Sequence, residues 1–182
     1  MTYNGENIYI RFIGKDDTED LLALTQRNRT HFEQVSPKRD ESYYSQDFHE
    51  KMIEGWIKQR EEDKRYVFGI FLKESDQLIG DISIFDIKRG PVQNCTLGYG
   101  LDQEHNGKGY MTEAIQLLLT FAFEEAKLQR VEAGVMPRNI GSIRVLEKAG
   151  FQREGLARKL LEINGTREDH VIFAMLAEDM KI

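Results

Sequence analysis

The chain has a single cysteine, Cys95, and this scarcity excludes two classes of protein. One thiol cannot form an internal disulfide, so the fold does not depend on the cross-links that small secreted domains use. No cluster of cysteine and histidine residues has the spacing of a structural zinc site. We therefore expect neither a disulfide framework nor a bound metal.

Long apolar segments are also missing. The longest apolar runs are a few residues, such as 117–119, whereas a membrane-spanning helix needs about 20. The first residues, MTYNGENIYI, contain no basic segment followed by an apolar one, so no secretory signal is visible. These absences predict a cytoplasmic protein without membrane association.

A basic surface is lacking as well. The chain has 31 acidic and 25 basic residues, which gives a formal net charge of −6 at pH 7. A general nucleic-acid binder would carry a basic stripe, so we expect no direct contact with nucleic acid. An acidic surface would instead steer a basic partner, such as a peptide rich in lysine and arginine, although mild acidity is also ordinary for soluble enzymes.

No stretch rich in proline, glycine or serine divides the chain, and no internal repeat is visible. With 182 residues, 40% of them hydrophobic, the chain has the size and composition of one domain with a substantial core. We expect residues 1–182 to form a single domain. The sequence leaves open whether it acts as a monomer or a homodimer.

Hydrophobic periodicity predicts where strands and helices lie. The predicted strands are 8–13, 65–72, 77–87, 92–101, 130–136, 153–163 and 167–177, and the predicted helices are 16–31, 44–63, 109–126 and 139–150. The last two strands form a hairpin around Asn164-Gly165, which is a strong two-residue turn signal. In the second helix, Phe48, Met52 and Trp56 recur at four-residue spacing, which favours a place in the core over one in an acceptor groove. Strands and helices alternate only in the second half, which favours an α+β (mixed α/β) fold with a mixed sheet.

Residues 105–114, HNGKGYMTEA, place two glycines around a lysine directly before a predicted helix. The stretch is not a Walker A loop, because Gly107-Lys108 is followed by glycine rather than serine or threonine. It is not a dinucleotide fingerprint either, because the third glycine of that motif is missing. Two interpretations remain. Gly107 and Gly109 let an anion approach the N–H groups that open the helix, or they only close a tight turn between a strand and a helix.

Three motifs carry a resemblance that extends these observations: GYGLDQEHNGKGYMTEA (98–114), VMPRNIGSIRVLEKAGF (135–151) and GFQREGLARKLLEINGTREDHVIFAML (150–176). With them the chain resembles the GNAT superfamily of acyl-CoA N-acyltransferases, whose signature is Gln/Arg-x-x-Gly-x-Gly/Ala. The central GKG matches, while both ends of the signature depart from it. The chain looks most like the RimJ/RimL group, acetyltransferases that act on the alanine or serine N-termini of ribosomal and other proteins.

The resemblance implies a three-layer sandwich with a splayed, mostly antiparallel mixed sheet of about seven strands flanked by helices. Strands 97–101 and 130–136 would part and admit the pantetheine arm of acetyl-CoA. The residues that the resemblance assigns to acetyl-CoA are Tyr99, Gly100 and Leu101 through their backbone, Gly107, Lys108, Gly109, Tyr110, Met111 and Thr112 around the pyrophosphate, and Asn139 and Ser142 near the pantetheine and thiol.

Acetyl transfer needs a neutral amine, a stabilised oxyanion and a proton for the departing thiolate. An α-amine with a pKa of about 7.7–8.0 is roughly a tenth neutral at pH 7, whereas a lysine near about 10.4 is under about a thousandth. An N-terminal acceptor therefore needs little help from a base. Some relatives carry a glutamate at the position of Gly134. Glu132, two residues earlier, shares the same strand face and is the candidate base, directly or through a water molecule. The alternative is that Glu132 is only a partly exposed carboxylate at the end of a strand.

The proton donor of many relatives is a tyrosine at the position of Leu146, so that route is closed here. Ser142 is the remaining candidate near the thiol, as proton donor or as orienting group. A serine in the first turn of a helix can also serve only the backbone. His170 shares a strand face with Ile172 and is more simply explained as a sheet histidine than as a base. The resemblance makes the loop 35–42 the wall of the acceptor site.

The leading hypothesis is an acetyl-CoA-dependent N-acetyltransferase, and its most favoured acceptor is the N-terminal α-amine of a protein, such as a basic ribosomal protein. One alternative is an acetyltransferase for a small-molecule amine, such as a polyamine, an antibiotic or an amino-acid analogue. Another is a catalytically silent CoA-binding protein, because neither the tyrosine nor the glutamate of other relatives is present.

Overall fold

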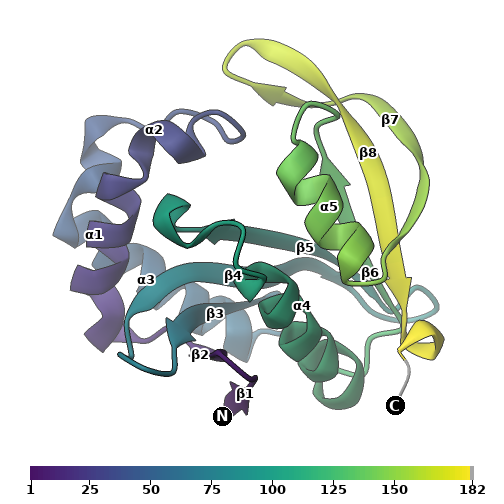
Figure 1. Ribbon diagram of the computed structural model, residues 1–182, viewed down its shortest axis with the longest axis horizontal. Coiled ribbons are helices and arrows are strands. Elements are labelled where there is room, and N and C mark those ends of the chain that lie inside the picture. The colour runs from purple at the N-terminus through teal and green to yellow at the C-terminus, as the bar shows by residue number, and fades with distance from the viewer. Residues whose placement is uncertain (181–182) are drawn as a thin grey trace.

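The computed structural model of the protein describes residues 1–180, which form one open sheet of eight strands with helices on both faces (Figure 1). The strand order is β1-β2-β3-β4-β5-β6-β8-β7, and all neighbours are antiparallel except β5 and β6. The sheet is therefore mixed and mostly antiparallel, as predicted. The strands are β1 (Thr2–Asn4), β2 (Ile8–Phe12), β3 (Arg65–Leu72), β4 (Leu78–Lys88), β5 (Asn94–Leu101), β6 (Arg130–Val135), β7 (Gln152–Ile163) and β8 (Thr166–Leu176).

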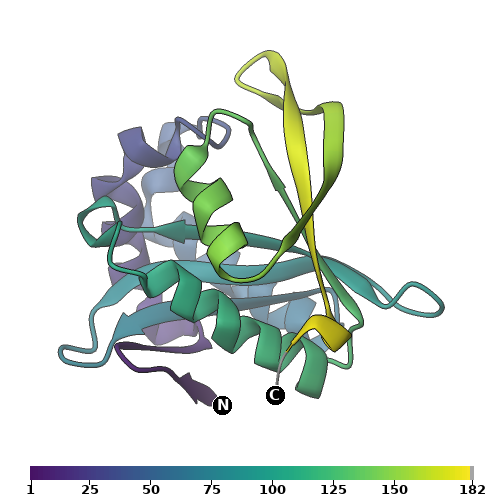
Figure 2. The same cartoon turned by 45° about the vertical axis from the view of Figure 1, so that its right-hand side comes forward.

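Helices flank the sheet on two sides (Figures 1 and 2). They are α1 (Thr18–Arg27), α2 (Arg29–Phe32), α3 (Gln46–Glu61), α4 (Tyr110–Thr120), which continues as a π-helical segment at Phe121–Glu125, and α5 (Ile140–Lys148). Within residues 1–180, none of these helices is long and apolar enough to cross a membrane.

Two apolar clusters hold the layers together. On one face, Ile115 and Leu118 of α4 are fully buried against sheet residues such as Phe68. On the other face, Leu24 of α1 and Ile53 of α3 pack with β3 in a second cluster. A fully buried side chain of this size contributes about 1.5–3 kcal/mol relative to its exposed state, so the helices are fixed mainly by these contacts.

The strands β5 and β6 pair only briefly before they diverge. Their parallel pairing covers Asn94–Thr96 against Arg130–Glu132. Beyond that point β5 continues beside β4, while β6 continues beside β8. The sheet therefore splits into two wings, as the predicted splay requires.

Three details of the fold differ from the sequence-based expectation. The short strand β1 was not predicted, and it pairs with β2 at the edge of the sheet. The predicted helix 16–31 breaks at Asn28, because this buried side chain donates to the Leu24 carbonyl and accepts from the N–H of Gln103, a tertiary contact that local sequence does not reveal. The prediction that Phe48 faces the core is wrong. Its side chain is exposed, and His49 and Ile53 are the buried residues of α3.

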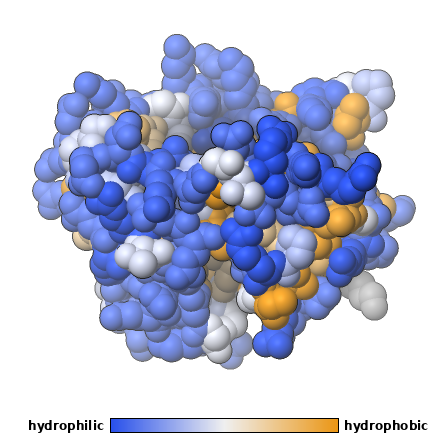
Figure 3. All heavy atoms as spheres, turned by 90° about the horizontal axis from the view of Figure 1, so that it is seen from above, coloured by the Kyte–Doolittle hydropathy of each residue, from blue (hydrophilic) through white to orange (hydrophobic). Residues whose placement is uncertain are grey.

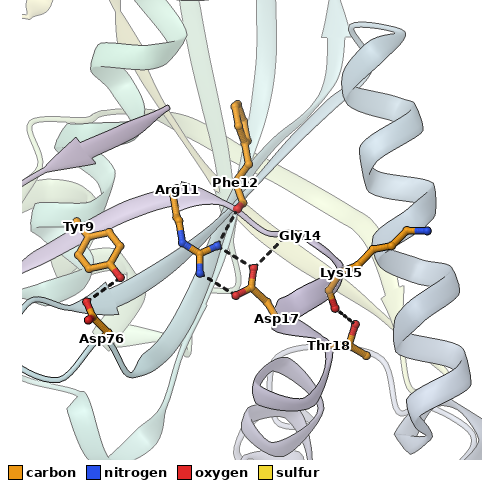
Figure 4. Close-up of polar contacts among 8 residues, drawn as sticks. All are labelled: Tyr9, Arg11, Phe12, Gly14, Lys15, Asp17, Thr18 and Asp76. Carbon is orange, nitrogen blue, oxygen red and sulfur yellow. Dashed lines mark hydrogen bonds and ion pairs between the residues drawn. The ribbon is translucent and has the colours of Figure 1, made fainter.

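An ion pair with a buried carboxylate connects the start of α1 to strand β2 (Figure 4). Both guanidinium nitrogens of Arg11 lie 2.8 Å from the carboxylate oxygens of Asp17, and the Gly14 N–H donates to the same carboxylate at 2.8 Å. Burial opposes the ionisation of Asp17, but the hydrogen bonds from Arg11 and Gly14 outweigh it and lower the pKa of this carboxyl.

We predict that Asp17→Asn lowers the free energy of unfolding by about 2–3 kcal/mol at neutral pH, because it leaves Arg11 without its charged partner. Arg11 is partly solvated, so the loss is smaller than for a fully buried ion pair. The melting temperature should fall by roughly 4–12 °C. Because the folded-state pKa is lowered, the contribution is present above the ordinary carboxyl pKa and is lost as the pH falls through the lowered pKa, where wild type and variant should converge. Asp16→Asn, at the exposed neighbouring position, is the control. An equal loss at all pH values would contradict the assignment to this ion pair.

Candidate active site

The site is organised by the gap between β5 and β6. Residues 97–101 of β5 are bonded to β4 on one edge, and in the described part of the chain their other edge has no β6 partner. Figure 2 shows β6 and the β7–β8 hairpin rising away from β5 at this point. The free backbone groups of such an edge can bind an extended amide chain in the way that an added strand would.

The glycine turn lies at the end of the same strand, directly before α4. Gly107 and Gly109 have φ angles of 77° and 83°, which other residues adopt only with strain. A Cβ atom at either position would meet no heavy atom within 4 Å, so the backbone here is open to a ligand. Gly109 is the residue before the first turn of α4, and no side chain caps the helix. Its first N–H groups are therefore available to an anion.

A buried acid anchors this turn to the helical layer. Asp102 is 2% exposed and accepts a hydrogen bond of 2.7 Å from Nε of Arg27 on α1. The amide oxygen of Asn28 accepts from the N–H of Gln103 at 2.9 Å. Burial opposes the ionisation of Asp102, but the bonds from Arg27 and the Glu104 N–H outweigh it and lower its pKa, so the carboxylate stays charged. The start of the glycine turn is thus held at a fixed place relative to α1.

Two hydroxyl groups meet across the gap. Tyr99 Oη of β5 lies 2.6 Å from Ser142 Oγ in the first turn of α5. Asn139 caps α5 by accepting from the Ser142 N–H at 3.3 Å. Burial raises the pKa of Tyr99 to about 12, so its phenol keeps its proton at neutral pH and can donate it. The arrangement is a pair of protonated hydroxyls between the two wings.

The side chain of Tyr99 had not been predicted to take part in the site, because sequence reasoning assigned only its backbone. The signal was present in the alternation of β5. Leu97 and Leu101 are buried in the cluster that contains α4, and Tyr99 projects to the same side. What could not be read from the sequence is the position of α5, which brings Ser142 to the phenol.

Glu132 lies apart from these hydroxyls. It belongs to the last residue pair that β5 and β6 share, and the alternating neighbours Val131 and Ala133 are buried in the cluster that contains α5. Its side chain therefore projects to the opposite face of the sheet. There its carboxylate lies 2.8 Å from Nε of Arg130, which also pairs with Glu154.

The remaining candidates take structural positions. Leu146 is fully buried in the core, so it cannot contact a ligand in the gap. His170 is 4% exposed and its Nδ1 lies 3.0 Å from the Glu168 carbonyl, which fits the sheet-histidine interpretation. Within residues 1–180 there is no group of three or more His, Cys, Asp or Glu side chains that could hold a metal ion.

The loop after α2 and the tip of the β7–β8 hairpin close the gap at one end. The Lys38 N–H donates to Oδ1 of Asn164 at 2.8 Å, and Nδ2 of Asn164 donates to the Glu33 carbonyl at 3.5 Å. Figure 1 shows these two segments approaching each other above the sheet. Seen from that end in Figure 3, the surface is largely hydrophilic, and hydrophobic residues gather on the side of the hairpin and α5, where Leu156, Leu161 and Ile140 are exposed.

Known proteins resemble the whole chain. Residues 7–152 match the family model described as acetyltransferase (GNAT) domain. The chain is 50% identical over 175 residues to the "probable N-acetyltransferase YjcK" of Bacillus subtilis, which covers 96% of this chain and 97% of that protein. The ribosomal-protein-S5-alanine acetyltransferase of Vibrio fischeri superposes with a TM-score of 0.92 and 30% identity over 100% of both chains. RimJ of Mycobacterium smegmatis in complex with CoA-disulfide superposes with a TM-score of 0.93 and 24% identity over 99% of this chain and 89% of that chain.

Proposed function

We propose that this chain, which belongs to the GNAT family of acetyltransferases, transfers the acetyl group of acetyl-CoA to the N-terminal α-amine of a cytoplasmic protein. Membership in the family and the similarity to named N-acetyltransferases make the chain an N-acetyltransferase. The observation that carries the choice of acceptor is the full-length similarity to a ribosomal-protein-S5-alanine acetyltransferase at 30% identity.

The charge of the chain and the chemistry of the acceptor support the same choice. The net charge of −6 would attract a basic protein, such as a ribosomal protein, and would slow the approach of an acidic one. An α-amine has a pKa of about 7.7–8.0, so it loses its proton far more readily than a lysine side chain at about 10.4. A site without a strongly basic group can therefore use an N-terminus more easily than a lysine.

The donor site proposed here uses the free edge of β5 and the glycine turn. When bound, acetyl-CoA supplies an acetyl group activated as a thioester. The backbone of Tyr99, Gly100 and Leu101 would bind the amide chain of pantetheine, and Asn139 would contact it from α5. The N–H groups after Gly107 fit a pyrophosphate, because a Cβ atom at Gly107 or Gly109 would meet no heavy atom within 4 Å and the backbone can be approached closely. The group assigned to the pyrophosphate is Gly107, Lys108, Gly109, Tyr110, Met111 and Thr112.

The hydroxyl pair is the proposed source of the proton that the sulfur needs. Ser142 Oγ would give its proton to the departing thiolate and be supplied again by the phenol of Tyr99, which lies 2.6 Å away. A phenol with a pKa of about 12 is almost fully protonated at neutral pH, so it can act as a donor but not as a base. Glu132 remains a candidate base, with its carboxylate held by Arg130.

We predict that CoA raises the melting temperature of the wild type and that Gly109→Val removes most of this shift. A ligand at a hundredfold excess over its Kd stabilises by about 2.7 kcal/mol, and a valine side chain would block the approach of phosphate to the backbone. Gly90→Val is the matched control, because Gly90 also has a positive φ (69°) and open space around it but lies in the turn at the other end of β5. A folded Gly109→Val protein with the full shift would refute the phosphate assignment.

A thiol-release assay tests the acceptor. We predict turnover with peptides that begin with Ala, Ser or Met and carry a free N-terminus. The same peptides with a blocked N-terminus and an internal lysine should react at least about a hundredfold more slowly at neutral pH, because the lysine is neutral so much more rarely. Preferential turnover of polyamines or other small amines would support the alternative acceptor instead. Modification of internal lysines alone would contradict the proposal.

A double-mutant cycle tests the hydroxyl pair. We predict that Ser142→Ala lowers kcat by about 10- to 100-fold with a smaller change in KM, because the lost proton serves charge that appears late in the reaction. Tyr99→Phe should lower kcat less, and the double variant should be no worse than Ser142→Ala alone, since Tyr99 acts through Ser142. Tyr9→Phe, which loses a surface phenol bonded to Asp76, is the control. Additive losses would mean that the two hydroxyls act separately.

A further inference from the structure

A polar recess lies on the face of the sheet opposite α4 and α5. On β4, Ile82 and Ile84 are buried against α4, so the alternating residues Asp81 and Ser83 project to the other face. Both are partly exposed although β4 is a central strand of the sheet. Central strands are usually covered on a face that carries helices, so the partial exposure of the polar residues Asp81 and Ser83 needs an explanation.

On the neighbouring strand, Gly100 leaves the recess unfilled beside Asp81, whereas Phe85 takes the space above Gly98, where a Cβ atom would lie only 3.0 Å from its ring. Asp81 pairs with Gly100, and Ser83 pairs with Gly98, so two successive positions on this face of β5 carry no side chain. A Cβ atom on Gly100 would lie 3.6 Å from Oδ1 of Asp81 and 3.6 Å from the ring of Phe32. The carboxylate and this aromatic ring thus border the space above Gly100.

The recess lies directly behind the donor site. Gly98 and Gly100 belong to the same free segment of β5 whose Tyr99 reaches Ser142 on the opposite face. On the second wing, Gly134 is the corresponding bare position, and a Cβ atom there would lie 3.7 Å from the His170 side chain. The two faces of β5 at the opening therefore differ, because the hydroxyl pair lies on one and Asp81 lies on the other.

Unlike the buried acids Asp17 and Asp102, the partly exposed Asp81 has no hydrogen-bonding partner among residues 1–180. Asp17 and Asp102 are each bound by an arginine. Among residues 1–180, no group donates a hydrogen bond to the Asp81 carboxylate. The titratable groups that interact with it electrostatically are Arg65 on β3, whose guanidinium lies over the Phe85 ring, and the phenol of Tyr43. Burial raises the pKa of Asp81 to about 6, although Arg65 opposes the shift. A carboxylate that is mostly withdrawn from water and has no partner among residues 1–180 destabilises a fold, so its retention points to a function.

We propose that Asp81 receives the ammonium group of the acceptor and removes its proton. The proposal rests on the acetyl transfer and holds for any primary amine. One proton passes from the nitrogen to the Asp81 carboxylate and then to solvent. The lone pair left on nitrogen forms the N–C bond with the acetyl carbon while the C–S thioester bond breaks and its electron pair leaves on sulfur. The sulfur gains a proton from the Tyr99–Ser142 pair. The nitrogen loses its second proton to solvent as the amide forms, and the hydroxyl pair takes one proton back from solvent.

The strength of this base suits an α-amine. A carboxylate with a pKa of about 6 lies about two units below an α-ammonium group at about 7.7–8.0, so the proton transfer is uphill by roughly a hundredfold. A lysine at about 10.4 would make the same step uphill by more than ten-thousandfold. A base of this strength thus favours an α-amine over a lysine as the acceptor. The proposal of an α-amine acceptor does not itself depend on Asp81.

We expect Asp81→Asn to lower kcat/KM by about 10²- to 10³-fold near neutral pH. The pH profile is the more specific measurement. The wild-type rate should rise through the pKa of Asp81 near about 6, whereas the variant should rise only through the pKa of the free amine at about 7.7–8.0. The defect should therefore shrink as the pH approaches about 9. Asp86→Asn, the same change at an exposed position of the same strand, is the control.

Thermal stability distinguishes a functional acid from a structural one. The folded-state pKa of Asp81 is raised, so its ionised form destabilises the fold above about pH 6, and this loss disappears below the ordinary carboxyl pKa. Asp81→Asn should raise the melting temperature by roughly 2–6 °C at about pH 8 and leave it unchanged at about pH 4. A structural acid would give a lower melting temperature in the variant. That result would overturn the proposal.

Gly100→Ala fills the recess and leaves the carboxylate in place, because its Cβ atom would lie 3.6 Å from Oδ1 of Asp81, an ordinary van der Waals contact. We expect a raised KM for the acceptor. An unaltered pH dependence of the rate in Asp81→Asn would overturn the proposal. A shifted pH dependence in Glu132→Gln would also overturn it, because Glu132 would then be the base. If only small amines are turned over, the proposal of an N-terminal α-amine acceptor fails. The same Asp81→Asn measurements, made with a small amine as acceptor, then still test whether Asp81 is the base.

Discussion

The early end of the pairing between β5 and β6 is the constraint on which the rest of the site depends. Parallel pairing covers only three residue pairs, after which each strand is held by its other neighbour. A continuous sheet would have bonded residues 97–101 along both edges and left no backbone for a ligand. Because α4, α5 and buried residues of both wings belong to one apolar cluster, the gap is a property of the folded core rather than of a mobile loop.

The gap gives the two substrates of an acetyl transfer separate approaches. The glycine turn and the Tyr99–Ser142 pair lie on the side of α4 and α5, while Asp81 lies on the opposite face beside the bare position of Gly100. A proton can thus leave the amine on one side of β5 while another is supplied to sulfur on the other side. The pKa values fit these opposed roles. Asp81, with a pKa of about 6, is ionised at neutral pH and can accept a proton, whereas Tyr99, with a pKa of about 12, stays protonated and can donate one.

Much of this arrangement was predictable from the sequence, and the exceptions have physical reasons. Periodicity predicted seven of the eight strands, and the family resemblance predicted the splay and the glycine turn. The three-residue strand β1 is too short to show a period. The break at Asn28 and the meeting of Tyr99 with Ser142 depend on contacts between segments far apart in the chain. Asp81 was missed because a lone acid on an alternating strand looks like an ordinary exposed residue until its neighbours on β5 are known to be glycines.

The site also departs from what stability alone would favour. The helix α4 begins at a glycine without a side-chain cap, two glycines occupy left-handed conformations, a strand edge is unpaired, and a carboxylate lies in a recess without a partner. Each feature weakens the fold by an amount that an ordinary substitution could recover. Ion pairs with a buried carboxylate, such as Arg11–Asp17 and Arg27–Asp102, lie outside the gap and secure the elements around it. The destabilising features are concentrated where two substrates must meet, which is the distribution expected if binding and proton transfer, rather than packing, determine those residues.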